Sequence, residues 1–203
     1  MQTNDGRLIV VGGASRSGKT AYVKKAVRGS SRLCAWDAED QWAQLPGWKR
    51  VTTKAGLLDA ITKPGAFKVA YVPGGDLQRQ FDFWAGCVQY AGRYVEGLTC
   101  IAEELADVTS PAKAPGNWGI LLRRGLKRGI TIYAISQRWA EADKTALGNA
   151  SEFVLFAQSS ADDVRYLAKK TRIEQAELDA LVPLQYVRYE VATRAVSRGK
   201  LKF

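Results

Sequence analysis

The feature that most constrains this sequence is the segment GASRSGKT at residues 13–20, which fits the pattern G-x-x-x-x-G-K-T. Glycines in this pattern let the backbone turn tightly and aim its N–H groups inward at phosphate oxygens. A helix that starts behind the loop adds the positive end of its dipole. In such a loop Lys19 reaches the outer phosphates and the Thr20 hydroxyl ligates Mg²⁺.

The flanking sequence supports a phosphate-binding loop. A short apolar run, residues 8–11, precedes it and predicts a buried strand. Residues 19–27, KTAYVKKAV, place small and apolar side chains at helical spacing, and Gly29 is a plausible helix stop. The alternative, an ordinary Gly/Ser turn, does not require a strand before it and a helix after it. The predicted nucleotide-binding residues are Gly13, Ala14, Ser15, Arg16, Ser17, Gly18, Lys19, Thr20 and Ala21.

Composition bounds the remaining possibilities. A chain of 203 residues that is 46% hydrophobic can bury a sizeable core, so we expect a single domain over residues 1–203. No apolar run approaches the length of a membrane span, so no integral membrane segment is expected. The formal net charge of +10 favours a polyanionic partner, nucleic acid first, over a basic surface that only keeps the protein in solution.

The titratable residues exclude two kinds of site. The chain has no histidine, and its three cysteines show no C-x-x-C spacing. A zinc site and histidine-based acid–base chemistry are therefore not expected. Cys34 and Cys100 lie inside apolar runs and are interpreted as small core residues.

Short apolar runs alternate with helical patterns along the chain. The predicted strands are residues 8–11, 33–36, 67–72, 98–102, 130–135 and 153–156. The predicted helices beyond the first are residues 56–62, 77–90, 117–128 and 160–170. This alternation predicts an α/β fold with a mainly parallel central sheet flanked by helices. The tail, residues 185–203, alternates apolar and basic residues and is interpreted as a terminal strand or hairpin.

Two acidic residues follow the fourth predicted strand. In LTCIAEEL, residues 98–105, Glu103 and Glu104 come directly after the apolar run. One carboxylate can hold Mg²⁺, and the next can polarise a water for attack on a phosphate. Adjacent residues of a strand point to opposite faces, so the two acids could divide these tasks. The alternative is the solvated first turn of a helix, where glutamate is favoured.

A polar pair ends the fifth predicted strand. ITIYAISQRW, residues 130–139, leads from apolar residues into Ser136 and Gln137. An amide at this place can sense a phosphate or orient the attacking water, or it can be an ordinary residue at a strand end. Trp139 can stack on a base, although a core or interface tryptophan is the commoner case.

Taken together, these motifs resemble a family. The loop, the strand ending in two glutamates, the segment from Gly129 to Arg138 and the segment NASEFVLF at residues 149–156 look like the FtsK–HerA group of translocating ATPases. Within it, a chain without added domains is most similar to the genome-packaging ATPases of tailless DNA viruses with an internal membrane. The resemblance implies a RecA-like P-loop NTPase fold of the ASCE type, with ATP and Mg²⁺ as cofactors.

The resemblance also assigns roles by position. Lys19 and Thr20 match the nucleotide lysine and the magnesium threonine, and Glu103 matches a metal-side position that is usually aspartate. Glu104 matches the catalytic glutamate and Gln137 the sensor glutamine. The family often has proline after Gln-Arg, where this chain has Trp139, so the turn there departs from the pattern.

The family works as rings, usually hexamers, in which an arginine of a neighbouring subunit completes each site. In many relatives an arginine follows a glycine where this chain has Leu126, so the arginine cannot be transferred by position. Arg124 and Arg128 in LLRRGLKRG are the candidates, with Arg138 a third. A basic solvated helix face is the alternative for this segment.

The implied partners are double-stranded DNA, bound through phosphates without sequence specificity, and capsid vertex or portal proteins. Candidate DNA contacts are the loop around Lys113 and the region of Gln78 and Arg79. The implied location is the host cytoplasm, with virion association at a packaging vertex as a further possibility. Other interpretations are a filamentous-phage assembly ATPase of the zonula occludens toxin type, a small-molecule phosphotransferase and a nucleotide-binding protein without hydrolysis.

Overall fold

A mixed sheet runs through the whole protein. The computed structural model describes residues 6–112, 114 and 116–202, and within them the sheet has nine strands in the order β3-β4-β2-β5-β6-β1-β7-β8-β9. All neighbours in this order from β3 through β1 to β7 pair in parallel. Strand β8 pairs antiparallel with both β7 and β9. The strands are β1 (Leu8–Gly12), β2 (Arg32–Trp36), β3 (Lys49–Val51), β4 (Phe67–Tyr71), β5 (Thr99–Ala102), β6 (Thr131–Ser136), β7 (Glu152–Phe156), β8 (Gln185–Glu190) and β9 (Val196–Lys200).

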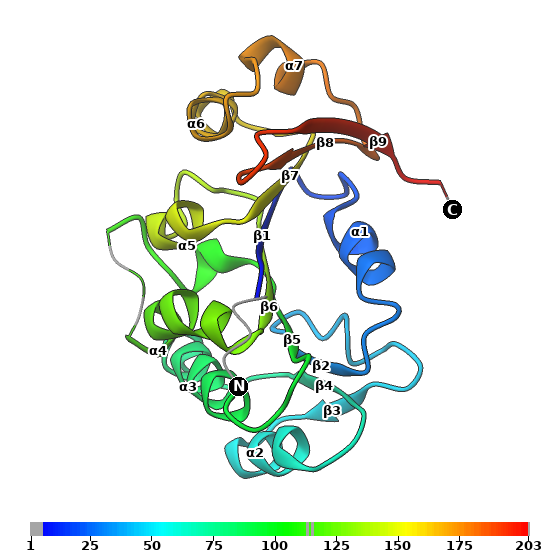
Figure 1. Ribbon diagram of the computed structural model, residues 1–203, viewed down its shortest axis with the longest axis vertical. Helices are drawn as coiled ribbons and strands as arrows, with labels where there is room; N and C mark the ends of the chain where they lie inside the picture. The colour runs from blue at the N-terminus through cyan, green and yellow to red at the C-terminus, as the bar shows by residue number, and fades with distance from the viewer. Residues whose placement is uncertain (1–5, 113, 115, 203) are drawn as a thin grey trace.

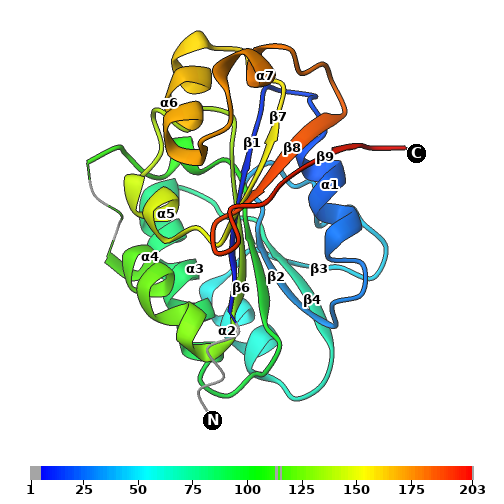
Figure 2. The same cartoon turned by 45° about the horizontal axis from the view of Figure 1, so that its top comes forward.

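Helices cover both faces of this sheet, as Figures 1 and 2 show. Helix α1 lies alone on one face, and α2 to α5 lie on the other. Helices α6 and α7 lie beyond α5, next to the C-terminal hairpin. Within the described residues, no helix has the length and apolarity needed to cross a membrane. The helices are α1 (Lys19–Ala26), α2 (Lys54–Thr62), α3 (Leu77–Ala91), α4 (Gly116–Ile120), α5 (Lys144–Asn149), α6 (Ala161–Thr171) and α7 (Gln175–Asp179).

The central strands are apolar because both of their faces are covered. Every residue of β1 and of β7 is buried. Side chains that alternate along these strands enter two separate clusters, one under α1 and one under α2 to α6. Parallel sheets covered in this way require near-continuous apolar runs rather than alternating ones. The six predicted strands and the α/β class are therefore confirmed, as is the hairpin predicted for the tail.

Four helices begin with a side-chain cap, but α1 does not. Thr53, Asp76, Asp143 and Ser160 each accept a hydrogen bond from a backbone N–H in the first turn of α2, α3, α5 and α6. Helix α1 follows Gly18, and no side chain caps it. A helix start leaves backbone N–H groups that need an acceptor. The first turn of α1 is therefore open to an anion.

The predicted helix over residues 117–128 was wrong as a single regular element. It begins as α4, changes to a π-helical turn (Leu121–Gly125) and ends in a 3₁₀ turn (Leu126–Arg128). The carbonyl of Leu126 accepts the Gly6 N–H, and that of Gly125 accepts the Ile130 N–H. These bonds tie the segment to chain outside it and compete with regular helical pairing. The prediction also missed the short elements β3, α5 and α7, and α1 ends before Gly29.

The three cysteines are buried free thiols, so the interpretation of Cys34 and Cys100 as core residues is confirmed. Burial raises the pKa of the Cys34 and Cys87 thiols to about 12. Both thiols are therefore neutral and unreactive at physiological pH.

Aromatic side chains fill the core between α3, α4 and the sheet. The fully buried Phe81 lies with its ring centroid 5.2 Å from that of Trp36, 5.5 Å from Trp84 and 5.1 Å from Trp118. Centroid separations of this size are typical of favourable aromatic pairs. Phe81 thus connects a strand with two helices.

We expect Phe81→Ala to lower the free energy of unfolding by about 3–5 kcal/mol, because it opens a cavity among rings that cannot collapse into it. Tyr94→Ala is the control, since that residue is 71% exposed, and it should cost less than about 0.5 kcal/mol. Urea unfolding followed by circular dichroism measures both. Equal effects of the two substitutions would contradict a central role for Phe81.

Candidate functional site

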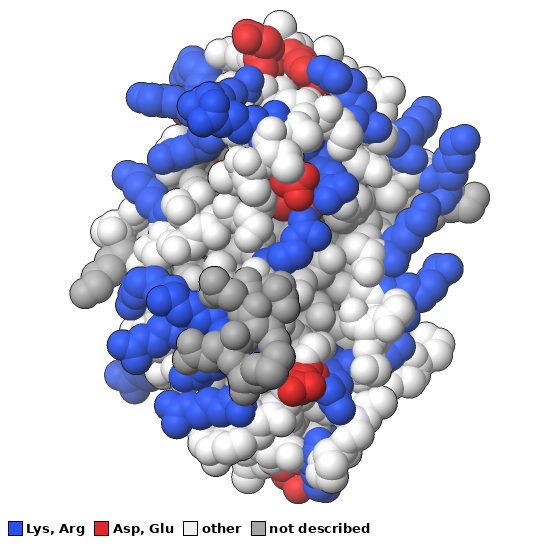
Figure 3. All heavy atoms as spheres, in the orientation of Figure 1, with Lys and Arg blue, Asp and Glu red and all other residues white. Residues whose placement is uncertain are grey.

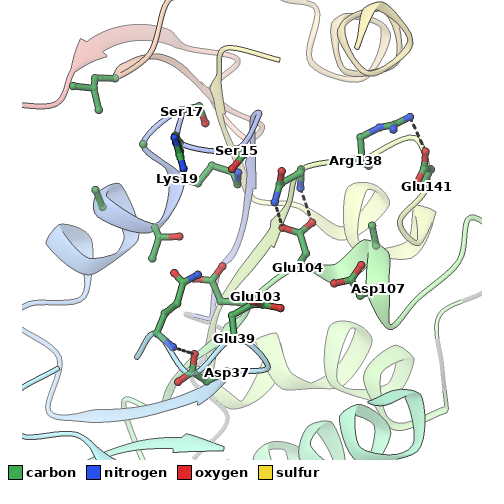
Figure 4. Close-up of a pocket in the computed structure, with 18 residues that line it drawn as sticks. Ser15, Ser17, Lys19, Asp37, Glu39, Glu103, Glu104, Asp107, Arg138 and Glu141 are labelled. Carbon is green, nitrogen blue, oxygen red and sulfur yellow. Dashed lines mark hydrogen bonds and ion pairs between the residues drawn. The ribbon is translucent and has the colours of Figure 1, made fainter. Parts of the chain in front are cut away.

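The strand ends of the sheet gather polar side chains at one edge. The parallel register pairs Trp36 with Ala102 and Gly12 with Ser136. The residues that follow these strands therefore surround a common space, a cavity of about 880 Å³ (Figure 4). Such an edge is where open α/β sheets bind ligands.

The loop between β1 and α1 has a backbone that only glycine fits at two positions. Gly13 has φ 157° and Gly18 has φ 118°. A Cβ on Gly13 would lie 2.6 Å from Ser17 Oγ, and one on Gly18 would lie 3.0 Å from Leu201 and Phe156 side chains. Arg16 also has a positive φ, 59°, in the left-handed region. The glycines of the motif are thus needed by the loop itself.

The loop is tied to the C-terminal half of the chain. The Ala14 N–H donates to the Ala157 carbonyl at 2.7 Å, and the Leu184 N–H donates to the Ser17 carbonyl at 2.8 Å. The Ser17 hydroxyl is buried, and among the described residues it has no hydrogen-bond partner. A buried hydroxyl without a partner is costly and suits a site that receives an acceptor from a ligand. Together with the uncapped start of α1, it fits a phosphate.

Lys19 lies inside the loop. It is 7% exposed, and its Nζ donates to the carbonyls of Gly13 at 2.7 Å and Ala14 at 2.9 Å. Burial lowers the pKa of the ammonium, while the nearby carboxylates of Glu104 and Glu103 act to raise it. The ammonium can therefore pair with an anionic ligand in the cavity, which the two carboxylates also line.

Glu104 lies beyond the end of β5 and is held by β6. Its Oε1 accepts the Gln137 backbone N–H at 2.9 Å, and its Oε2 accepts the Gln137 side-chain amide at 3.1 Å. The Ser136 hydroxyl lies 3.4 Å from Oε1. Glu104 has φ 47°, a left-handed conformation that is uncommon for a residue with a side chain. The backbone turn directs the carboxylate to the end of the neighbouring strand.

Glu103 is held from the other side. Its Oε1 accepts a hydrogen bond from the indole N–H of Trp42 at 2.8 Å. Burial raises the pKa of Glu103 to about 7, the Trp42 hydrogen bond acts to lower it, and the charge of Glu104 raises it further. The two acids therefore have different partners, although the left-handed turn at Glu104, rather than strand alternation, separates them.

The predicted site residues converge with few exceptions. Residues 15–21 line the cavity together with Glu103, Glu104 and Gln137. Gly13 and Ala14 lie behind this lining and supply the carbonyls that hold Lys19. Thr20 thus lies on the same cavity as Glu103, as the expected metal position requires.

Of the three candidate arginines, only one lies on the cavity. Arg138 lines the cavity, and its guanidinium pairs with Asp163 at 2.9 Å and Glu141 at 2.6 Å. Arg124 and Arg128 precede β6 and do not line it, since the site lies at the far end of that strand. Arg128 donates to the Gln89 carbonyl at 2.7 Å.

Trp139 is a core residue, so stacking on a base is excluded for it in this structure. It is fully buried, and its indole N–H donates to the Val11 carbonyl at 3.1 Å. Its ring would lie 2.8 Å from a Cβ on Gly12. Trp139 therefore packs against the end of β1, directly before the loop of residues 13–20.

Of the two regions expected to contact DNA, Lys113 lies outside the described residues. The Gln78 and Arg79 region forms the first turn of α3, where the Arg79 side chain is 86% exposed and pairs with Asp76 at 3.3 Å.

Sequence reasoning missed part of the cavity wall. Asp37 directly follows β2, and its buried carboxylate accepts the backbone N–H groups of Gln41, Trp42 and Ala43. The rule that identified Glu103, a polar residue directly after a buried strand, would have identified Asp37 as well. The further lining residues that were not predicted are Glu39, Gln41, Ala106, Asp107, Glu141 and Leu184.

Comparisons with known proteins agree with this arrangement. No family model matches the chain. The chain is 28% identical over 206 residues to Protein P9 of Pseudoalteromonas phage PM2, which covers 96% of this chain and 90% of P9. The genome packaging NTPase B204 from Sulfolobus turreted icosahedral virus 2, in complex with AMPPCP, has a TM-score of 0.80 at 13% identity, covering 99% of this chain and 100% of B204. The bacterial conjugative coupling protein TrwB has a TM-score of 0.66 at 9% identity, covering 98% of this chain and 85% of the TrwB chain.

The chain has a P-loop NTPase fold. The resemblance inferred from the sequence is confirmed at the level of the fold by these neighbours, a genome packaging NTPase and a conjugative coupling protein. At these identities the structural likeness concerns the fold, and the expected RecA-like α/β architecture is the one observed.

In this P-loop NTPase fold, the protein would supply only some of the donors of a cation site, and a bound ligand would supply others. Among the described residues, no group of three or more acidic, cysteine or histidine side chains is placed to hold a metal ion. Mg²⁺ typically binds one or two protein oxygens together with phosphate oxygens and water. Thr20 and Glu103 fit such a partial set of donors.

We expect the raised pKa of Glu103 to make the metal-free protein less stable as the pH rises. The folded pKa of about 7 exceeds the ordinary 4.5, so between these values the folded state binds more protons than the unfolded state. The free energy of unfolding should therefore fall across this window, by an amount on the order of 1–3 kcal/mol.

Urea unfolding in EDTA at pH 5 and pH 7.5 measures the effect, and Glu103→Gln is the control because its amide does not titrate. Parallel pH dependences of the two proteins would contradict the expectation.

Proposed function

We propose that this chain is an ATP-hydrolysing DNA translocase, the motor ATPase that pumps a viral genome into a preformed capsid. The observation that carries the proposal is the Glu104 carboxylate, held by the backbone and side-chain N–H groups of Gln137 on the cavity that Lys19 also lines. The fold shared with the genome packaging NTPase B204 supports the choice of task, and the similarity to P9, a phage protein, supports a viral origin.

Nucleotide binding would use the loop and the start of α1. The uncapped N–H groups of the first turn, the Ser17 hydroxyl and the Lys19 ammonium supply donors for phosphate oxygens. Lys19 would exchange the loop carbonyls for a phosphate, which better satisfies a buried ammonium. Thr20 and Glu103 would hold Mg²⁺, which would neutralise charge on the phosphates.

Hydrolysis requires a base that positions water. With no histidine in the chain, carboxylates are the available groups near neutral pH. Glu104 can accept a hydrogen bond from water and polarise it towards the terminal phosphate. Gln137 prevents the Glu104 carboxylate from rotating away, because it donates a hydrogen bond to each carboxylate oxygen. Gln137 therefore acts through Glu104, and a phosphate-dependent change in its own hydrogen bonds would link ligand state to catalysis.

The surface suits a polyanionic partner. Lys and Arg predominate over Asp and Glu on the face shown in Figure 3, in keeping with the net charge of +10. Contacts with double-stranded DNA would be made to phosphates, so they would weaken with salt and show no sequence preference. The proposal includes a homo-oligomeric ring, expected to be hexameric, that docks on capsid vertex or portal proteins in the host cytoplasm or at the virion.

We expect Glu104→Gln to lower ATP hydrolysis at least 100-fold while ATP still binds, because the amide cannot polarise water. Lys19→Ala should lose binding as well as hydrolysis. Phosphate release with and without double-stranded DNA, beside binding of a fluorescent ATP analogue, measures both effects, and DNA should accelerate the wild type.

Glu141→Gln is the matched control, because this carboxylate lines the same cavity but is 56% exposed and pairs with Arg138. Its rate should stay within about twofold of the wild type. Hydrolysis that is indifferent to DNA would argue against translocation and leave a nucleotide hydrolase with another partner.

Arg124 is the best candidate for the arginine that acts in a neighbouring subunit. It is exposed and makes no hydrogen bond or ion pair within the described part of the chain. Arg128 and Arg138 are both engaged with other groups. We expect Arg124→Ala to abolish hydrolysis, because transition-state charge on the phosphate is left without its partner.

Mixing inactive Arg124→Ala with inactive Glu104→Gln should restore part of the activity, because some interfaces then combine an intact arginine with an intact glutamate. Lys127→Ala, on the same segment, is the control and should remain active. Failure of every mixture to recover activity would place the arginine elsewhere.

A further inference from the structure

The loop after β2, which contains no recognised motif, places Trp42 in contact with Glu103. The Asp37 carboxylate organises this loop by accepting three backbone N–H groups, at 2.8, 3.0 and 2.9 Å. A fourth hydrogen bond, from the Asp40 N–H to the Asp37 carbonyl at 3.1 Å, closes the turn. A carboxylate with three such donors is a strong local constraint. The loop therefore fixes the backbone of Trp42.

The side chain of Trp42 contacts Glu103 and the helix that carries Thr20, the two residues of the predicted metal position. It is fully buried and packs on Trp48, with ring centroids 5.1 Å apart. The ammonium of Lys24 lies 5.5 Å from the centroid of the Trp42 ring. Lys24 is one helical turn after Thr20 on α1, whereas the indole N–H meets Glu103 beyond β5. Trp42 thus contacts both the helix that carries Thr20 and the residue that would face it.

The indole N–H also decides which oxygen of Glu103 is available. Indole nitrogen is a donor only, so its bond to Oε1 has a fixed direction. Oε2 has no hydrogen-bond partner among the described residues. The carboxylate is therefore oriented with one oxygen engaged and one left for a cation. In a glutamate, which has one more rotatable bond than aspartate, such an external constraint compensates for the longer side chain.

We propose that Trp42 is a positioning residue for the metal site: its indole N–H holds Glu103 so that Oε2 remains available to Mg²⁺ bound with a nucleotide. This inference rests on the proposed function, because it needs a nucleotide and Mg²⁺ in the cavity. It adds a residue outside the sequence motifs and gives the loop after β2 a role in the site. Packing of the ring alone would not require the hydrogen bond.

Trp42→Phe tests the proposal, because phenylalanine keeps an aromatic ring in the core and removes the N–H. Trp48→Phe is the matched control, since it changes the adjacent ring and leaves the Glu103 bond in place. Binding of a fluorescent ATP analogue is measured in EDTA and across a Mg²⁺ titration. We expect equal binding in EDTA and a Mg²⁺ half-saturation concentration raised about tenfold in Trp42→Phe only.

A double-mutant cycle with Glu103→Gln separates positioning from general damage. In the Glu103→Gln background, Trp42→Phe should no longer change the Mg²⁺ requirement, because the oxygen it orients has lost its charge. Intrinsic fluorescence gives a readout independent of activity: Mg²⁺ with nucleotide should change the emission of wild type and Trp48→Phe, and the change should be absent from Trp42→Phe.

The outcomes distinguish the two proposals. An unchanged Mg²⁺ requirement in folded Trp42→Phe overturns the positioning role and leaves the proposed function intact. A wild type that binds no nucleotide with Mg²⁺ overturns both. If Trp42→Phe does not fold, benzothienylalanine at position 42 replaces it, because that side chain has the shape of indole and lacks the N–H. The same tenfold increase is then expected, and its absence overturns the role.

Discussion

The parallel register at the centre of the sheet is the constraint on which the site depends. Backbone pairing sets Trp36 beside Ala102, and Ala102 beside Ala134. The next residues on two of these strands, Asp37 and Glu103, therefore leave the sheet at one level. A shift of one residue in any of these strands would turn its side chains to the other face and move its terminal carboxylate. Apolar burial on both faces makes that shift costly, so core packing maintains the geometry of the polar edge.

Much of this arrangement could be predicted from the sequence because strong local signals coincide with long-range ones. The loop motif has a defined backbone, and strands buried on both faces leave continuous apolar runs, so the amino-acid pattern alone places residues 13–20, Glu104 and Gln137 at one edge. The features that could not be predicted depend on tertiary contacts. The irregular turns after α4 carry a hydrogen bond from the distant Gly6 N–H to the Leu126 carbonyl, which no local pattern reveals. The orientation of Glu103 arises from Trp42, which is 61 residues away in the chain.

The two glutamates show how similar residues acquire different surroundings. Both follow β5 directly, yet one meets an indole and the other an amide and a backbone N–H. The left-handed backbone at Glu104 makes this possible, because it bends the chain between them. Strain at such a position persists only where neighbouring contacts compensate for it. Here the compensation comes from hydrogen bonds at the end of β6, so an uncommon backbone and a side-chain network support each other.

The ties between the loop and the C-terminal half have an entropic consequence. Ala14 is bonded to Ala157, Ser17 to Leu184, and Lys19 to the carbonyls of its own loop, so contacts within the chain hold the surface of this loop in place. A preorganised surface loses little conformational freedom when a ligand arrives, so little of the binding free energy is consumed in ordering it. In the ring that we propose, that free energy would remain available to change how one subunit sits against the next.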